Sequence, residues 1–375
     1  MFYDLRCGNE RTLVVGGGPA GSACAWRLAA AGRPVILAEK ENMPRRKVCG
    51  GILSSRAAAF LTGSGMVTAE EMDGLTLRTH LTISFWDRGE HLRTYTAPGR
   101  PVRIVPRAGF DAFLLERAAS CGADVRTGCR VESFSDPRTA VTGSGERLRF
   151  THLVGADGCV SMVRRLISGR RSRKTGMGLH YDIPMEDFPS PPVDLEVHFG
   201  RIPYGYIWVI PGRESVNLGA GALGSPASPS DIVKALGRFM EEKDLHAGDH
   251  ELHGAPIPSL NLDRSLGKGK VYLAGDAAGT VDQVSGEGIG QALESGMMAA
   301  DCISAGDRRE EVLAAPGSCL ESVRQSVFYR HLLHGRLTRG TAMRAIRDSE
   351  VFAEAYWDII SGNGSYSGIF LRVFS

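Results

Sequence analysis

The stretch TLVVGGGPAG at residues 12–21 decides the fold. Its first four residues, a threonine and three apolar residues, predict a short buried strand, and the glycines that follow fit the pattern G-x-G-x-x-G at Gly16, Gly18 and Gly21. In this pattern the first glycine permits a tight turn, the second lets the backbone approach a pyrophosphate, and the third lets a helix pack closely on the strand. Because the motif lies between a predicted strand and a predicted helix, it indicates a dinucleotide site.

The residues after the turn complete one β-α-β unit. Pro19 and Ala20 begin a helix predicted over residues 20–31, and a second apolar strand over 34–38 is followed by Glu39. The N-terminus of that helix faces the negative phosphates. An acid at the end of the second strand accepts hydrogen bonds from ribose hydroxyls, and its charge repels a 2′-phosphate. We therefore expect an unphosphorylated adenosine here.

Composition and charge exclude several classes of protein. The chain has 375 residues, of which 43% are hydrophobic and 23% charged, as in globular proteins of ordinary composition. A net charge of +2 without a dense Lys/Arg stripe argues against a nucleic-acid partner. The eight cysteines lack C-x-x-C spacing, so we expect free thiols, no metal site and a cytoplasmic location. No apolar run reaches the roughly 18 residues of a membrane span, so any membrane contact is expected to be peripheral.

Hydrophobic periodicity divides the rest of the chain. Strands are predicted over 75–105, 125–141, 148–154, 176–222 and 270–274, and helices over 110–121, 231–242, 288–303 and after 306. The predicted fold class is α/β, with a discontinuous Rossmann-type domain over 1–75, 102–170 and 268–305. A sheet-rich substrate-binding domain is expected over 76–101 and 171–267, and a C-terminal helical segment over 306–375.

Two Gly-Asp turns extend the predicted nucleotide site. Residues 155–158, GADG, follow one predicted strand, and residues 272–278, YLAGDAA, close another. Either turn alone is a common loop, but their order after the glycine motif resembles the group A flavoproteins, which have a glutathione-reductase-like fold. In that family the later aspartate, here Asp276, holds the ribityl chain of the flavin. The resemblance implies FAD as the tightly bound cofactor.

A narrower resemblance covers most of the chain. Residues 47–54 (KVCGGILS), 107–111 (RAGFD), 203–211 (PYGYIWVIP), 276–296 and 362–366 (GNGSY) resemble motifs of the geranylgeranyl reductase family. This family implies that reduced flavin reduces carbon-carbon double bonds in an isoprenoid or similar apolar substrate. The motifs and the resemblance together assign contacts with FAD to Gly16, Gly18, Pro19, Ala20, Gly21, Glu39, Lys40, Lys47, Val48, Cys49, Gly50, Arg107, Asp157, Gly275, Asp276, Gly286, Gly288 and Ile289.

Two departures leave other reactions open. Gln283 stands where that family commonly has proline, in the loop that covers the flavin ring. Residues 203–211 also resemble the W-x-W-x-I-P segment of flavin-dependent halogenases, although only Trp208 matches and no catalytic lysine is identifiable. A flavin monooxygenase acting on an aromatic, peptide or carrier-bound substrate would have the same fold. Hydroxylation is therefore the main alternative, and halogenation a weaker one.

Cys49 is the candidate catalytic residue. It lies about ten residues after Glu39, where the chain of this fold returns beneath the flavin, and Gly50 after it lets the backbone approach the ring. The basic neighbours Arg46 and Lys47 favour a reactive thiol or a phosphate contact. A small packed thiol is the competing interpretation, because free cysteine is among the most buried residue types. The hypothesis is that Cys49 or an ordered water delivers a proton.

Three aromatic residues are predicted to contact the substrate. Tyr204, Tyr206 and Trp208 alternate along a predicted strand, so their side chains share one face. Such a wall suits a small apolar or aromatic substrate, free or borne by a protein or lipid, and packing in a sheet core is the competing interpretation. No second G-x-G-x-x-G with an acid follows, so we expect NAD(P)H to visit the cleft transiently or a redox partner protein to deliver electrons.

Overall fold

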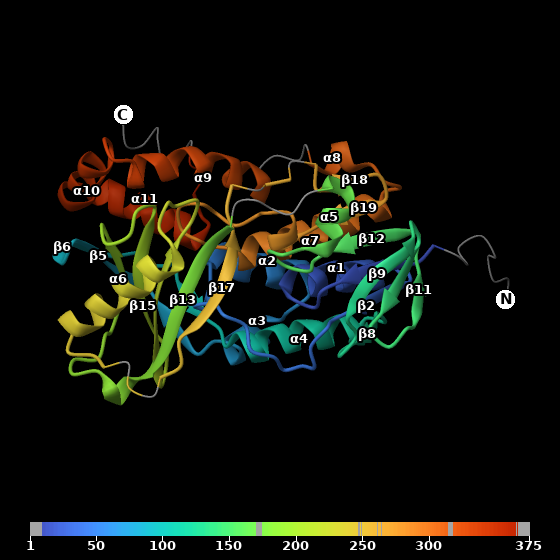
Figure 1. The fold of residues 1–375 in the computed structure, drawn as a ribbon, viewed down its shortest axis with the longest axis horizontal. Helices are drawn as coiled ribbons and strands as arrows, with labels where there is room; N and C mark the ends of the chain where they lie inside the picture. Colours follow the sequence, from blue (N-terminus) through green and yellow to red (C-terminus); the bar gives the residue numbers. More distant parts are fainter. Residues whose placement is uncertain are drawn as a thin grey trace.

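The computed structural model describes residues 10–169, 175–246, 248, 250–260, 262–263, 265–313, 318–364 and 366. Two large sheets lie side by side along the long axis of the molecule, and the C-terminal helices run along one side of the second sheet (Figure 1). Ser365 of the predicted GNGSY tail lies outside the described residues. The same holds for parts of each predicted domain, and the domain limits stay a prediction.

The first sheet is built around the stretch that decides the fold. β1 (Thr12–Val15) pairs in parallel with β2 (Val35–Ala38) on one side and β12 (His152–Gly155) on the other. All three strands are buried along their whole length, because both faces of a parallel sheet are covered. The six-stranded order β18-β19-β12-β1-β2-β8 adds β8 (Asp124–Arg126), β18 (Gly267–Lys268) and β19 (Val271–Leu273).

Helices cover one face of this sheet and a meander covers the other. α1 (Pro19–Ala30), α4 (Arg107–Ser120) and α7 (Ile289–Ser304) pack on the face that carries Val14 and Leu37. The opposite face packs against β9 (Val131–Asp136), β10 (Thr139–Thr142), β11 (Arg147–Arg149) and α5 (Met162–Ser168). The α/β fold class with a Rossmann-type domain is thus confirmed.

The second sheet has seven strands in the order β17-β13-β16-β15-β14-β5-β6. They are β5 (Thr82–Asp87), β6 (Glu90–Thr96), β13 (Thr175–Pro184), β14 (Leu195–Phe199), β15 (Gly205–Pro211), β16 (Ser215–Ala222) and β17 (His253–Pro258). Neighbours are antiparallel except β14 and β5, which are parallel. The strands predicted over 75–105 split between two sheets, because β4 (Arg78–His80) and β7 (Val102–Ile104) pair with β3 (Ile52–Leu53) instead.

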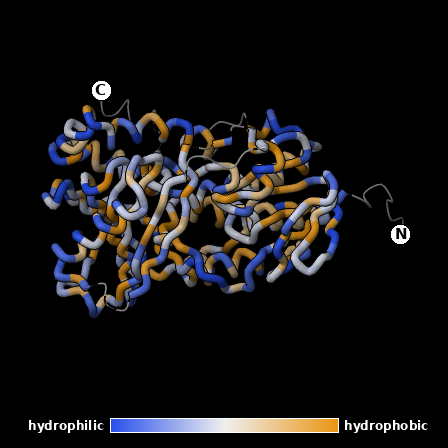
Figure 2. The backbone as a smooth tube through the Cα atoms, viewed as in Figure 1, coloured by the Kyte–Doolittle hydropathy of each residue, from blue (hydrophilic) through white to orange (hydrophobic). Residues whose placement is uncertain are grey.

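The second sheet has helices on both faces. α6 (Pro229–Glu242) packs on one face, while α10 (Arg339–Asp348) and α11 (Glu350–Ser361) pack on the other, where Tyr356 meets the ring of Phe85 edge-on at 5.2 Å. The remaining helical elements are α2 (Ser55–Ser64), α3 (Ala69–Gly74), η1 (Met185–Asp187), η2 (Gly275–Ala277), α8 (Arg309–Leu313) and α9 (Cys319–His334). Hydrophobic residues follow the inner elements, and the outer loops are hydrophilic (Figure 2). Among the described residues, every helix is too short or too polar to cross a membrane.

The packing of helices on the first sheet depends on a close crossing of α1 and α7. A Cβ atom at Gly296 would lie 2.1 Å from the carbonyl oxygen of Ala20, and one at Gly21 would lie 1.8 Å from that of Gly16. Both obstacles are backbone atoms, which cannot move aside as a flexible side chain does. Gly21 therefore has the packing role that its place in the motif predicts, and Gly296 has the corresponding role where the second helix crosses the first.

We expect Gly296→Ala to lower the free energy of unfolding by about 1–3 kcal/mol, because the new methyl group forces the two helices apart. Chemical denaturation of the purified protein measures this change. Gly63→Ala is the matched control, because Gly63 also lies inside a helix but a Cβ atom there would meet nothing within 4 Å. That variant should be neutral or more stable by about 0.5–1 kcal/mol, and equal losses in both variants would contradict the packing argument.

Candidate active site

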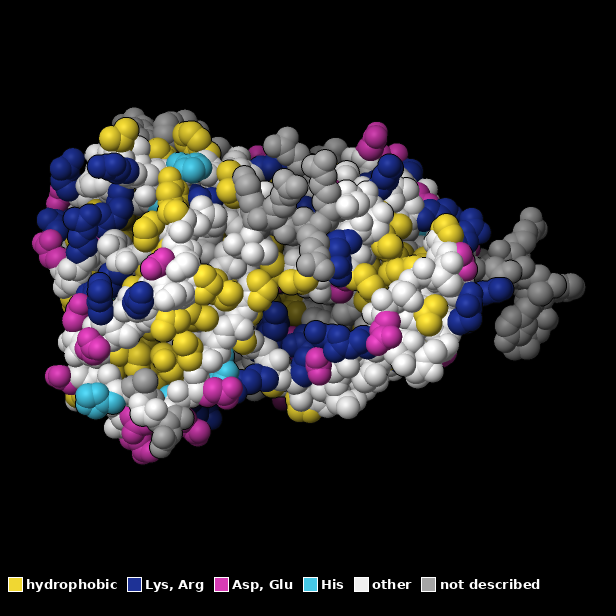
Figure 3. Space-filling model, viewed as in Figure 1, with side chains coloured by type: hydrophobic (Ala, Val, Ile, Leu, Met, Phe, Trp, Pro, Cys, Tyr) yellow, Lys and Arg dark blue, Asp and Glu magenta, His cyan; other side chains and the backbone are white. Residues whose placement is uncertain are grey.

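A cavity of about 990 Å³ lies between the two large sheets. It lies at the carboxyl ends of β1, β2 and β12, where ligands bind in open α/β sheets. In the space-filling view, Lys and Arg side chains gather along one edge of a hollow and hydrophobic side chains lie on its other side (Figure 3). The basic residues that line the cavity are Lys40, Arg45, Arg46, Lys47, Arg107, Arg130 and Arg165.

Nearly all the residues predicted for the site line this cavity. Those that do so are Gly16, Gly18, Pro19, Ala20, Glu39, Lys40, Lys47, Val48, Cys49, Gly50, Arg107, Asp157, Gly275, Asp276, Gly286, Gly288, Ile289, Tyr206 and Trp208. Gly21 lies behind the cavity wall, where it packs against Gly16. Tyr204 also lies outside the cavity.

The glycine turn presents backbone to the cavity. Gly16 has a φ of +105°, and a Cβ atom there would lie 2.3 Å from the carbonyl oxygen of Ala156, so the first glycine is required both by conformation and by space. Gly18 begins α1 without a side-chain cap, which leaves the N–H groups of the first turn available to an anion. A Cβ atom at Gly18 would meet only the Arg45 guanidinium, at 3.5 Å. The turn therefore fits a pyrophosphate.

Glu39 is fixed by the turn itself. Its Oε2 accepts a hydrogen bond of 2.6 Å from the Gly17 N–H, and its Oε1 accepts one of 2.9 Å from the Glu41 N–H. The residue is only 4% exposed. Each carboxylate oxygen keeps a further lone pair for a ribose hydroxyl. The acid that the sequence predicts for the adenosine is thus held in place before any ligand binds.

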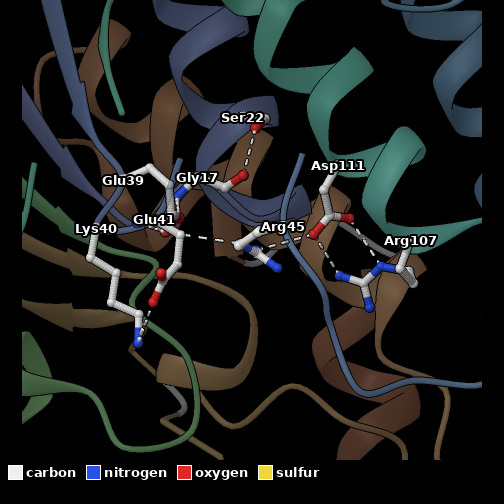
Figure 4. A network of polar contacts seen from close by, with 8 residues as sticks. All are labelled: Gly17, Ser22, Glu39, Lys40, Glu41, Arg45, Arg107 and Asp111. Carbon is white, nitrogen blue, oxygen red and sulfur yellow. Dashed lines mark hydrogen bonds and ion pairs between the residues drawn. The ribbon is translucent and has the colours of Figure 1, made fainter. Parts of the chain in front are cut away.

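A cluster of one buried acid and two partly buried arginines lies beside the turn. Figure 4 shows Arg45 between Glu39 and Asp111, with Arg107 on the other side of Asp111. Arg45 lies 3.1 Å from the fully buried Asp111 carboxylate, and Arg107 donates two hydrogen bonds of 2.9 Å to it. Sequence reasoning missed Arg45, although the basic run before Cys49 is a signal for it. Its place beside Gly18 suits a contact with phosphate.

The loop with Cys49 contacts this cluster through Arg107. Burial alone would lower the pKa of Arg107, but Asp111 and Cys49 together raise it above its ordinary value. The Cys49 sulfur also accepts a hydrogen bond of 3.4 Å from the Gly51 N–H. Arg46, predicted to activate the thiol, instead points to Asp182 of β13 at 3.6 Å. Arg107 is thus a basic neighbour of the thiol that the sequence did not predict for that role.

The two aspartates of the Gly-Asp turns have different roles. Asp157 accepts hydrogen bonds from Ser161 Oγ at 2.5 Å and from the Met162 N–H at 2.6 Å, so its carboxylate caps α5. The Asp276 carboxylate has no hydrogen-bond or ion-pair partner within the part of the chain that the structure describes, and the residue lines the cavity. Asp276 is thus available to a ligand, whereas Asp157 shapes the loop.

Two of the three predicted substrate aromatics form a wall of the cavity. Trp208 lies over Gly219, where a Cβ atom would come within 2.3 Å of its ring, and its Nε1–H donates to Asn217 Oδ1 at 2.8 Å. The Tyr206 hydroxyl donates to the carbonyl of Ser285 at 2.5 Å. Tyr204 precedes β15, with a φ of +52°.

The structure corrects two further expectations about side chains near the site. Tyr204 packs against α9, where the Arg330 guanidinium lies 4.6 Å from its ring centre and His331 lies 3.3 Å from its hydroxyl. Its positive φ ends the alternation on which the predicted shared face depended. Gln283 is buried, and its amide bonds to Ser259 and to the backbone around it, so it faces away from the cavity.

The FAD binding domain family matches residues 10–307. The chain belongs to this family of flavoproteins. It is similar to the menaquinone reductase of Mycolicibacterium smegmatis, with 32% identity over 317 residues that cover 78% of this chain and 76% of the relative. It is also 32% identical to the geranylgeranyl diphosphate reductase of Rhodobacter capsulatus over 313 residues, which cover 78% of this chain and 74% of that one.

Among solved structures, a geranylgeranyl bacteriochlorophyll reductase-like protein of Thermoplasma acidophilum has the same fold. Its TM-score is 0.67 at 22% identity, with 98% of this chain and 96% of that chain covered. The family match and the relatives confirm the resemblance to the geranylgeranyl reductases and the prediction of FAD. The chain is an FAD-dependent oxidoreductase. The N-terminus of α1, the anchored Glu39 and the Asp276 carboxylate, which has no partner among the described residues, fit that cofactor.

We expect Asp276→Ala to weaken FAD binding by about 10- to 100-fold, the effect of losing a charged hydrogen bond. The free energy of unfolding of the apoprotein should not change, because the carboxylate has no partner in the described chain. Asp157→Ala is the comparison, and loss of its cap should cost about 1 kcal/mol of stability. Titration calorimetry with FAD and denaturation of the apoprotein separate the two effects. Wild-type affinity in Asp276→Ala would refute the assignment.

Proposed function

We propose that this oxidoreductase reduces carbon-carbon double bonds in an isoprenoid chain or a similar apolar substrate. One observation carries the proposal: the cavity that begins at the glycine turn continues into an apolar chamber between the second sheet and α11. The chamber is lined by Ile83, Leu195, Val197, Tyr206, Trp208, Ile210, Tyr356 and Ile360. The names of the two relatives, a menaquinone reductase and a geranylgeranyl diphosphate reductase, support the same class of reaction.

Different residues of the chain would hold the cofactor, contact the substrate and donate the proton in such a reduction. FAD, when bound and reduced, supplies a hydride to one carbon of the double bond. The glycine turn, Glu39 and Asp276 hold the cofactor, and Trp208 and Tyr206 form the wall against which an apolar chain lies. Apolar walls exclude water from the reacting atoms. The second carbon needs a proton, and Cys49 on the cavity wall is the donor that the sequence suggests.

Anaerobic mixing of the reduced holoenzyme with geranylgeranyl diphosphate should give a product that carries two additional hydrogen atoms per reduced double bond. Menaquinone is the second substrate to try, because it is the other one named among the relatives. Mass spectrometry of the product and the return of the visible absorbance of oxidised FAD measure the reaction. A product with a new oxygen atom, formed only in air, would contradict the proposal and favour a hydroxylase.

For the electron donor we propose transient binding of NAD(P)H in the same cavity. NADPH and NADH, mixed in turn with the oxidised holoenzyme without oxygen, should bleach the visible absorbance of FAD, because a hydride acceptor in an open cavity is accessible to both. Stopped-flow absorbance gives the rates. Bleaching by neither nucleotide would point instead to a redox partner protein. An isoprenoid substrate held in lipid would further require peripheral contact with a membrane.

A further inference from the structure

Among the acids that line the cavity, Glu287 has no role in the reaction proposed above. Glu287 lies in the loop between η2 and α7. Its Oε1 accepts a hydrogen bond of 2.6 Å from Ser54 Oγ, and its Oε2 accepts one of 3.0 Å from Gln291 Nε2. A Cβ atom at Gly290 would lie 2.7 Å from Oε1, so the glycine at that position makes room for the carboxyl group. The acid is thus held in one orientation by neighbours from two helices.

Behind Glu287 lies a small polar cavity of about 20 Å³. One water molecule needs roughly 10–15 Å³ and two to four polar partners. Gln291 lines this cavity, and its Oε1 has no hydrogen-bond partner among the described residues. The other polar residues that line it are Ser54, Arg56, Asp282, Glu287, Glu294, Cys319 and Ser322. The volume and the unpartnered acceptor both fit a water molecule between Glu287 and the far wall.

The far wall of the small cavity leads toward the surface. Glu294 there forms an ion pair of 2.8 Å with Arg56, and their side chains are 10% and 37% exposed. Asp282 is fully enclosed, and the Tyr366 hydroxyl donates to both its carboxylate oxygens at 2.8 and 2.9 Å. Glu287 therefore touches the main cavity on one side and a polar chain that ends at a partly exposed pair on the other.

We propose that Glu287 stores the proton that the reduction consumes and donates it into the main cavity. This inference rests on the proposed function. With reduced FAD bound, the cofactor would supply a hydride to one carbon of the double bond and Glu287 would give its proton to the other, which would leave a saturated bond, oxidised FAD and a carboxylate. A proton that passes from solvent by way of Glu294 and the water in the small cavity restores the acid.

The charges around Glu287 agree with a stored proton. Burial raises the pKa of Glu287 to about 7, and the carboxyl groups of Asp282 and Glu294 act in the same direction. The hydrogen bonds from Ser54 and Gln291 oppose this shift. The titratable and charged groups that face it are Asp282 on its own loop, Glu294 on α7, Arg56 on α2, Cys319 on α9 and Tyr366. Near neutral pH a large fraction of Glu287 therefore carries a proton.

The first test reads the ionisation of Glu287 without any substrate. The visible spectrum of bound FAD in the wild-type holoenzyme should change with pH, with a midpoint near 7, and Glu287→Gln should abolish that change. Folding adds a second readout. The folded protein keeps the Glu287 proton up to about pH 7, whereas the ordinary pKa of a glutamic acid is 4.5. The free energy of unfolding of the wild type should therefore fall, relative to that of Glu287→Gln, as the pH rises from about 4.5 to about 7. Identical pH curves in the two proteins, by both readouts, would overturn the proposal.

The second test reads proton delivery in single turnovers of the reduced holoenzyme with geranylgeranyl diphosphate. Glu287→Gln should slow substrate reduction by roughly 100-fold or more while dithionite still reduces its FAD normally. The wild-type rate should fall as the pH rises through about 7 and the donor loses its proton. Glu321→Gln is the control and should match the wild type, because Glu321 is an exposed acid on α9 whose carboxylate accepts only from Gln325 among the described residues.

Cys49→Ala completes the comparison, because the thiol is the competing donor. A loss of roughly 100-fold in Cys49→Ala together with wild-type turnover in Glu287→Gln would overturn the proposal. If the wild type itself leaves the isoprenoid unreduced, the proposed function fails. The spectral and stability curves still report whether Glu287 holds its proton at the cavity wall, so the two failures are distinguishable.

Discussion

The hydrogen bond from the Gly17 N–H to the Glu39 carboxylate is the contact on which the rest of the site depends. It joins the turn after β1 to the residue after β2. Because Glu39 also accepts from the Glu41 N–H, the chain leaves the strand in a fixed direction and brings Arg45 over the turn. The loop then continues to Cys49 on the cavity wall. The contacts of Glu39 therefore position both the adenosine end and the thiol end of the cavity.

The buried charge of Asp111 is the main energetic constraint on the position of this loop. Asp111 is fully buried, and removal of one partner from such a pair typically costs about 3–5 kcal/mol, because the remaining charge is left uncompensated. Here a single carboxylate holds both Arg45 and Arg107. The same ion cluster therefore places one cation at the glycine turn and another at the thiol. Its geometry connects cofactor binding with the environment of Cys49.

Local motifs could be predicted from sequence because their residues are neighbours along the chain. Gly16, Gly18 and Glu39 belong to one β-α-β unit, and Asp276 lies in the turn that follows β19, so pattern and spacing place all four at the carboxyl edge of the sheet. The prediction that Tyr204 lines the cavity with Tyr206 and Trp208 does not hold, for an equally local reason. Strand alternation assumes an extended backbone, and a positive φ one residue before β15 turns the side chain away.

Other parts of the site depend on contacts between distant segments, which no single-sequence pattern contains. Arg45 is oriented by Asp111 on α4, and Glu287 by Ser54, which lies 233 positions earlier. Tyr356 reaches the cavity from α11 only because that helix packs on the second sheet. The run G-E-G-I contains Glu287, but the sequence alone does not show that this residue lines both cavities.

The strands of the first sheet are separated along the chain by the strands of the second sheet, and this separation sets an order of assembly during synthesis. β19, Asp276 and α7 follow β17 in the chain, so the pairing of β12 with β19 and the crossing of α1 with α7 must wait until the whole inserted sheet has emerged from the ribosome. Contacts of such long range form slowly, and chains generally begin to fold from the N-terminus. The candidate FAD site, which includes Asp276, is therefore complete only after the second sheet has been synthesised.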